Sequence, residues 1–177
     1  MAPGEVQIQP AREADVPAIL SLIRDLAEYE KAAPGAVPIT EALLRDSLFG
    51  PAPAAEGLVA RAGDWVAGYA IFFHNFSSWR GRRGLYLEDL YVRPEFRRRG
   101  IGYALFREVA RVAVARGCVR LEWLVLDWNQ PAIDFYRSLG AVRLEEWTTF
   151  RLNDGALQAL AEAPTQKGRP PAPPVIT

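Results

Sequence analysis

The sequence is poor in the residues that bind metals and form disulfides, since its 177 residues include one cysteine, Cys118, and one histidine, His74. A single cysteine cannot form a disulfide within the chain, and a zinc site of the Cys/His type needs several such ligands. We therefore expect no metal, and a fold that depends on its hydrophobic core. Cys118 is expected to be a small buried apolar residue.

An excess of charge of one sign and long apolar runs are also absent. The 21 basic residues balance the 21 acidic ones, so composition shows no bias toward nucleic acid or an acidic membrane surface. No apolar run approaches the ~20 residues that a membrane span needs, and the N-terminus lacks the pattern of a signal peptide. We expect a cytoplasmic protein without nucleic-acid or membrane partners.

Apolar periodicity predicts an α/β fold with a mixed, mostly antiparallel central sheet flanked by helices. We expect strands at 6–11, 57–63, 64–73, 85–92 and 119–126, helices at 16–31, 41–48, 100–116 and 129–140, and a terminal hairpin of 141–144 and 146–152. Residues 75–84 are expected to form a loop. The strand–helix–strand unit around 100–116 should be parallel and right-handed. One domain is predicted over 1–162, followed by a disordered Pro-rich tail at 163–177.

The stretch RPEFRRRGIG, Arg93 to Gly102, concentrates four arginines and two glycines where a strand meets a helix. A helix N-terminus presents free N–H groups and a partial positive charge. Gly100 and Gly102 carry no side chain that would keep a ligand away, and arginines add forked donors. The stretch therefore predicts a pyrophosphate site, although it lacks the Walker and Rossmann patterns. The alternative is an ordinary tight turn beside a solvated basic face.

This stretch resembles the acyl-CoA-binding motif R/Q-x-x-G-x-G/A of the GNAT acetyltransferases, which Arg97, Gly100 and Gly102 match. NQPAIDFY, which begins at Asn129, resembles the second half-site of that family. The order LAEYE, YLEDLYV, RRRGIG and LDWNQPAIDFYRSLGA is similar to the spermidine/spermine N1-acetyltransferase family, and SSW and VLDWNQ resemble its thialysine Nε-acetyltransferase branch. The resemblance covers roughly residues 6–160.

The resemblance implies an acetyl-CoA-dependent N-acetyltransferase that acts on a primary amine of a small substrate. It implies direct attack in a ternary complex and a homodimer with residues of both chains near each amine site; an acyl-enzyme on Cys118 is the alternative route. The residues that it places at acetyl-CoA are Leu90, Tyr91, Val92, Arg97, Arg98, Arg99, Gly100, Ile101, Gly102, Tyr103, Asn129, Ala132 and Tyr136.

Acetyl transfer to an amine poses a proton problem. An alkylamine with a pKa of ~10.4 is neutral in only about one molecule in two thousand at pH 7. The resemblance makes Tyr136 the general acid that protonates the departing thiolate; the alternative is a core aromatic residue beside Ile133 and Leu139.

Glu88 is the candidate general base, since it interrupts an apolar strand, where desolvation would raise the pKa of its carboxyl. The resemblance places it at the amine, acting through a water. Asp89 follows it, and strand alternation would send the two side chains to opposite faces unless a β-bulge intervenes. The alternatives are a structural network with Arg or Tyr partners, or His74 as the base.

The resemblance implies an amine site lined by Tyr29, Glu30, Trp79, Glu88, Asp89 and Trp123. Carboxylates and aromatic faces suit a cationic amine, although packing or surface roles are the alternative for each. Ser77 and Ser78 stand where the polyamine-acetylating branch has an aspartate, which argues against spermidine or spermine as the main substrate.

Two rival functions remain open at this point. One is an N-acetyltransferase of the same superfamily that modifies a protein or peptide and needs an open groove. The other is a non-catalytic acyl-CoA-binding regulatory module, against which the presence of both Glu88 and Tyr136 argues. A nucleic-acid binder is weaker, since the basic run lacks wider basic surroundings.

Overall fold

The computed structural model describes residues 6–163, and these divide into two compact units, one up to Gln130 and one from Pro131. Each unit is described by itself. The Pro-rich tail expected at 163–177 lies, apart from Ala163, outside the described residues. No helix between residues 6 and 163 is both long enough and apolar enough to cross a membrane.

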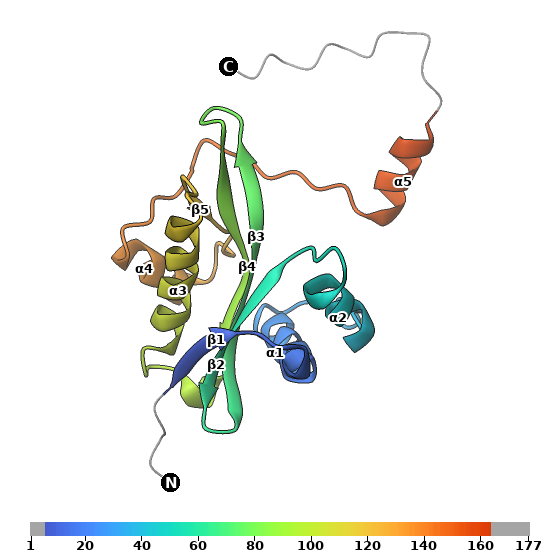
Figure 1. Cartoon of the computed structure of the whole chain (residues 1–177). Helices are drawn as coiled ribbons and strands as arrows, with labels where there is room; N and C mark the ends of the chain where they lie inside the picture. Colours follow the sequence, from blue (N-terminus) through green and yellow to red (C-terminus); the bar gives the residue numbers. More distant parts are fainter. Residues whose placement is uncertain (1–5, 164–177) are drawn as a thin grey trace. The chain divides into compact units, whose positions relative to one another are not determined.

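The first unit is built on a five-stranded sheet, shown in Figure 1. Its strands are β1 (Gln7–Pro10), β2 (Glu56–Ala62), β3 (Trp65–Ser77), β4 (Arg82–Val92) and β5 (Leu121–Glu122), and they lie in that order. Every neighbouring pair is antiparallel except β4 and β5, which are parallel. The mixed, mostly antiparallel sheet predicted from the sequence is confirmed, as is the parallel pair on either side of the long helix.

Helices cover both faces of this sheet. α1 (Val16–Tyr29) and α2 (Glu41–Phe49) lie on one face and α3 (Ile101–Ala115) on the other, and short 3-10 turns, η1 (Glu13–Asp15) and η2 (Pro94–Phe96), precede α1 and α3 (Figure 1). Thr40 caps α2 as expected, since its Oγ1 accepts a hydrogen bond from the Leu43 N–H at 3.3 Å.

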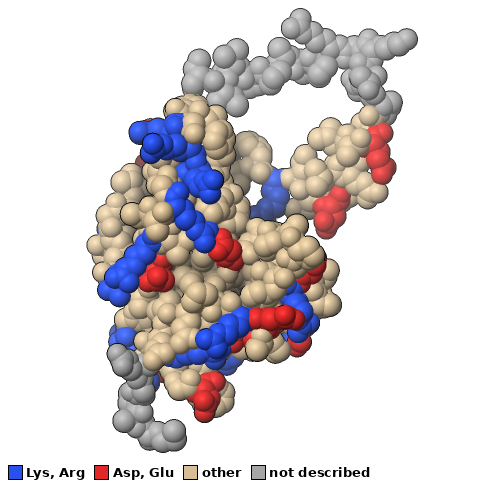
Figure 2. Space-filling model, in the orientation of Figure 1, with Lys and Arg blue, Asp and Glu red and all other residues tan. Residues whose placement is uncertain are grey.

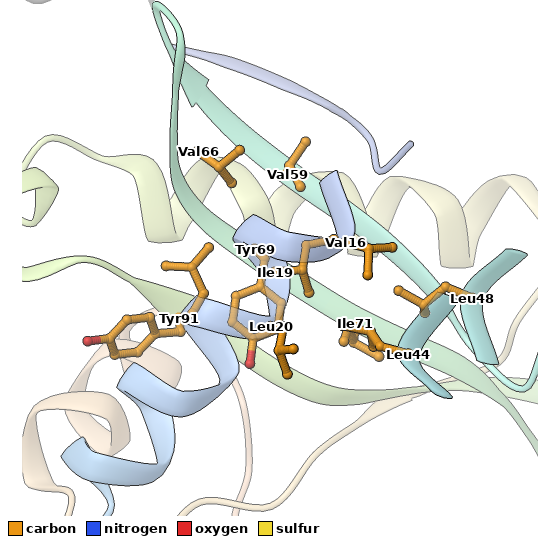
Figure 3. Packing of buried hydrophobic residues seen from close by; sticks show 11 residues of the cluster. Val16, Ile19, Leu20, Leu44, Leu48, Val59, Val66, Tyr69, Ile71 and Tyr91 are labelled. Carbon is orange, nitrogen blue, oxygen red and sulfur yellow. The ribbon is translucent and has the colours of Figure 1, made fainter. Parts of the chain in front are cut away.

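The core on the α1 and α2 side forms one apolar cluster (Figure 3). Its buried members are Val16, Ile19, Leu20, Leu22, Leu44, Leu48, Val59, Val66, Tyr69, Ile71 and Tyr91. On the opposite face the sheet buries Phe72, Leu85 and Leu87, and α3 contributes Leu105 and Val109. Two packed layers therefore hold β4 and the start of α3 in place from both sides.

The loop expected at 75–84 is wrong, because β3 and β4 continue as one long hairpin whose last pair is Ser77 and Arg82. The glycines and serines suggested a break in the strand. Gly84 instead allows the side chains of Asn75 and Arg120 to lie close to the backbone, since a β-carbon at this position would clash with Asn75 Oδ1 and lie 2.9 Å from Arg120 Cγ.

The strand expected at 119–126 shortens to Leu121–Glu122. It pairs with β4 only at Leu85 and Tyr86. β4 carries an extra residue two positions further on, and such a bulge bends its strand, so β5 does not follow it. Cys118, just after α3, is half-buried rather than buried.

The second unit contains two helices and no strand among its described residues. α4 (Gln130–Ser138) begins at the unit boundary, where a short helix was expected, and α5 (Asp154–Glu162) was not predicted. The terminal hairpin expected between residues 141 and 152 is wrong, since that segment has no strand pairing. Its alternating apolar pattern stays exposed; the exposed members are Val142, Leu144, Trp147, Phe150 and Leu152.

Candidate active site

The turn before α3 leaves its main chain accessible. Gly100 is the N-cap residue with φ +76°, a conformation that favours glycine, and no side chain of the described residues caps the helix. A β-carbon at Gly100 would meet nothing within 4 Å, and one at Gly102 only Val92 Cγ2 at 3.9 Å. The first-turn N–H groups, which have no intrahelical acceptor, therefore face open space that suits a diphosphate.

The arginines of this turn differ in their surroundings. Arg97 Nε donates to the Val92 carbonyl at 2.9 Å, and its guanidinium lies 5.0 Å and 5.3 Å from the ring centroids of Tyr29 and Tyr91. It is therefore held over β4 and the end of α1 by a hydrogen bond and two cation–π contacts. Arg98, with φ +62°, and Arg99 are exposed and better placed to meet a ligand from water.

Two further residues of the motif have contrasting positions. Ile101 is 2% exposed and anchors α3 in the core, so only its main chain can serve a ligand. Tyr103 is 49% exposed on the first turn of α3, with the Arg107 guanidinium 5.9 Å from its ring centroid. The turn thus combines an anchored backbone with accessible polar side chains.

An aromatic cluster, which the sequence reasoning missed as a unit, links α1 to the loop after β5. The Tyr29 hydroxyl donates to Asn129 Oδ1 at 3.0 Å, and its ring lies 5.9 Å from that of Trp128. Lys31 Nζ stands 4.8 Å over the Trp128 ring. Together with Arg97 these residues form an alternating series of cations and rings beside the donor turn. The aromatic residue next to Asn129 was the available sequence signal.

The outer edge of β4 is open where β5 leaves it. The β4–β5 ladder consists of two pairs, the last at Tyr86, so it does not continue to Leu90 and Val92. The Val92 carbonyl accepts from Arg97, as described above. The remaining main-chain groups along this edge can bind an extended chain by strand-like hydrogen bonds.

A β-bulge puts two carboxylates next to each other on β4. Asp89 pairs with Ile71 and Leu87 with Phe72, so Glu88 is the extra residue between them. Asp89 Oδ2 accepts a hydrogen bond from the Tyr69 hydroxyl at 3.0 Å, whereas Glu88 is exposed. The bulge thus supplies one partly buried and one accessible carboxylate, and the desolvation expected of Glu88 is wrong.

The surroundings of the β4 bulge are rich in carboxylates. Burial raises the pKa of Asp89 to about 6; the Tyr69 hydrogen bond lowers it, while the nearby charges of Glu88 and Glu30 raise it further. Burial also raises the pKa of Glu30. Burial and then the charge of Asp89 raise the pKa of Tyr69, which stays protonated as the donor to that carboxylate. Three carboxylates near one another favour a cationic ligand.

Two of the expected amine-site residues, Trp79 and Trp123, have surroundings of their own. Trp79 is 84% exposed in the hairpin turn next to Arg82, about 30 Å along β4 from Tyr91 by the rise of a strand. Trp123 packs edge-on against Phe106 of α3, with ring centroids 5.0 Å apart. The first unit brings together Tyr29, Glu30, Glu88 and Asp89, but not Trp79.

The remaining expected residues, Ala132 and Tyr136, belong to α4 in the second unit. Both are partly buried. Burial raises the pKa of the Tyr136 phenol to about 12, so this group is protonated at neutral pH and can donate a proton. Among residues 6–163 no group of three His, Cys, Asp or Glu side chains could hold a metal ion.

Comparison with known proteins places these features in a family. Residues 21–141 match the model of the acetyltransferase (GNAT) family. The chain is 44% identical over 167 residues to the thialysine N-epsilon-acetyltransferase of Bos taurus, covering 88% of this chain and 97% of that protein. It is 36% identical over 166 residues to spermidine/spermine N(1)-acetyltransferase-like protein 1 of Homo sapiens, covering 88% of this chain and 24% of that protein.

A solved structure agrees with the fold. The integron cassette protein VCH_CASS6 from the mobile metagenome of V. cholerae matches with a TM-score of 0.75 at 26% sequence identity. The match covers 89% of this chain and 98% of that one.

Proposed function

The chain belongs to the acetyltransferase (GNAT) family, and from this premise we propose that it transfers an acetyl group from acetyl-CoA to a primary amine of a small substrate. Thialysine or a lysine-like amino acid is the first choice, because the Bos taurus relative is named for thialysine. Diamines and polyamines are the next. The observation that carries the proposal is the acidic group of Glu30, Glu88 and Asp89 at the β4 bulge, which suits a cationic amine.

The donor side uses the open turn before α3. The pyrophosphate of acetyl-CoA binds the first-turn N–H groups beyond Gly100, with Arg97, Arg98 and Arg99 supplying positive charge. The pantetheine chain follows the free edge of β4 at Leu90–Val92. This arrangement directs the thioester toward the bulge at Glu88.

The ammonium has to lose two protons, and the departing thiolate has to gain one. Glu88, accessible at the bulge, takes the first proton of the ammonium through a water, while the partly buried Asp89 holds the cation electrostatically. The free amine attacks the thioester carbonyl and loses its second proton to water as the C–S bond breaks. Tyr136 protonates the CoA thiolate and regains its proton from solvent. No covalent enzyme intermediate is involved, and the half-buried Cys118 has no role.

We extend the proposal to a homodimer in which both copies contribute to each amine site. Trp79 lies too far along its own hairpin to reach Tyr91 of the same chain, so it would serve the site of the other copy. The exposed apolar side chains of the segment 142–152 offer a surface that a second copy can cover.

The test is an amine panel that follows thiol release from acetyl-CoA. Thialysine, lysine, a short diamine, spermidine and a lysine-containing peptide are compared by kcat/KM, and we expect the small amino acids to lead. A lead of at least tenfold for the peptide would support protein acetylation instead. Tight CoA binding without thiol release on any amine would support a non-catalytic acyl-CoA-binding module.

A further inference from the structure

A second pocket lies at the end of the first unit that is remote from the donor turn. It is an open depression with a volume of about 600 Å³, which is within the range of small-molecule sites. Its lining residues are His74, Phe76, Gly81, Arg82, Arg83, Arg116 and Gly117. None of them belongs to the acetyl-transfer site described above.

The position of this hairpin pocket follows from the long β3–β4 hairpin. Phe76 pairs with Arg83, so this arginine lies directly across from an aromatic ring, and Arg82, which pairs with Ser77, follows it at the tip. Arg116 follows the C-terminal end of α3. Because α3 spans about 22 Å from Ile101 to Ala115, the hairpin pocket and the donor turn lie at opposite ends of the same helix.

The pocket has an excess of positive charge. Arg116 is already matched by Glu56, since both of its terminal nitrogens bond that carboxylate, one at 2.7 Å. Arg82 and Arg83 form no ion pair within residues 6–163, so two guanidinium groups stay unmatched. Figure 2 shows basic side chains gathered over this end of the hairpin. Guanidinium groups bind phosphate by paired, charge-assisted hydrogen bonds.

The pocket also presents an aromatic face. Phe76 is 66% exposed although it is a large apolar residue, and the Arg120 guanidinium lies close enough to donate to its carbonyl at 3.5 Å. An exposed ring among arginines can stack on a planar ligand while the guanidinium groups hold its phosphates. A solvated basic face alone would not require that ring.

We propose that the hairpin pocket binds a phosphorylated small molecule with a planar ring, of the nucleoside diphosphate class, separately from acetyl-CoA. Arg82 and Arg83 hold the phosphates, and Phe76 stacks on the base. The site is independent of the acetyl-transfer chemistry, since it shares no residue with that site.

The experiment is calorimetric titration of the full chain with ADP in the presence of saturating CoA, because CoA then occupies the donor turn and leaves only the hairpin pocket to the added ADP. The double variant Arg82→Gln/Arg83→Gln should lower ADP affinity at least tenfold, while Arg97→Ala at the donor turn should change it less than twofold. The matched control, Arg24→Gln/Arg111→Gln, removes two charges from exposed helix positions and should also change it less than twofold. The KM for acetyl-CoA should stay unchanged in the double variant, which also shows that it is folded.

Further probes separate the ring from the phosphates. Phe76→Ala should lower the affinity for ADP at least fivefold and change the affinity for inorganic pyrophosphate less than twofold. Loss of ADP binding with Arg97→Ala rather than with the hairpin variant would place ADP in the donor turn and overturn the proposal. An equal loss of ADP affinity in the control Arg24→Gln/Arg111→Gln would also overturn the proposal. So would an oligothymidylate that binds tenfold more tightly than ADP, since this would indicate a nucleic-acid surface.

Discussion

The two units of this chain differ sharply in how much of their apolar surface they bury. All of the buried apolar side chains in the described residues belong to the first unit, and those of the segment 142–152 and of α5 in the second are exposed. Yet the second unit carries Tyr136, the proposed acid. The packed sheet of the first unit holds the donor turn and the carboxylates between buried side chains.

The largest effect on activity should come from Tyr136 in the second unit, although that unit buries little apolar surface. Tyr136→Phe removes only the hydroxyl, so kcat should fall by about 10²–10⁴-fold, the usual contribution of a general acid, with the KM for acetyl-CoA within about threefold. Steady-state kinetics measure both. Tyr103→Phe, which removes a hydroxyl from the exposed start of α3, is the control and should leave kcat nearly unchanged. Comparable losses in kcat and KM would mean that Tyr136 binds the donor.

Stability should separate the units just as clearly. Leu105→Ala creates a cavity at a fully buried position of α3 and should lower the free energy of unfolding by about 2–5 kcal/mol. Leu157→Ala makes the same change on the half-exposed α5 and should cost less than about 0.5 kcal/mol. Urea denaturation measures the two values. If they were equal, the contrast in packing between the units would not hold.

Asp89 makes the stability of the first unit depend on pH. Its pKa rises from 3.8 to about 6 on folding, so between these values the native state holds a proton that the unfolded state has lost. The free energy of unfolding therefore falls as pH rises through this window, by about 3 kcal/mol for a shift of roughly two units.

Asp89→Asn removes that titration. Relative to the unmodified chain, the variant should gain up to about 3 kcal/mol in the free energy of unfolding between pH 4 and pH 7. Urea denaturation at both pH values is the measurement, with Glu95→Gln at an exposed position as the matched control. A pH-independent difference between Asp89→Asn and the unmodified chain would show that Asp89 is not desolvated.

The donor turn should respond to a change in Arg97. Arg97→Ala removes a charge near the pyrophosphate and the contacts to Tyr29, Tyr91 and Val92, so the KM for acetyl-CoA should rise about tenfold with kcat changed much less. Arg97→Lys keeps the charge without the planar fork and should give an intermediate value. An unchanged KM in Arg97→Ala would exclude this side chain from donor binding.

The smallest effect on stability should come from the exposed segment of the second unit. Phe150→Ser changes a side chain that is 91% exposed, so the free energy of unfolding of the monomer should fall by less than about 0.5 kcal/mol. If a second copy covers this segment, the dimer dissociation constant should rise at least tenfold. Sedimentation at several concentrations measures it, and a chain that is monomeric before the substitution would refute the dimer.

The sequence predicted the fold class and most of the first unit. The helical stripes of α1 and α3 and the turn at Gly100 depend on local periodicity and on one backbone conformation, which neighbouring residues encode directly. The grouping of Glu30, Glu88 and Asp89 was expected only through the family resemblance. The turn around Arg97 was predicted as a pyrophosphate site from its arginines and glycines, and that role stays a prediction.

Other features depended on pairing between distant segments, which local patterns do not contain. The stretch NFSSWRGRRG at the tip of the β3–β4 hairpin was predicted as a loop, whereas Gly84 within it lets Asn75 and Arg120 approach the paired strands. The segment 141–152 has the alternation of a strand but no partner to pair with among the described residues. The local sequence thus determined where the chain can form helices, turns and strands; the tertiary structure decided which strands pair, because a β-ladder exists only where two segments meet.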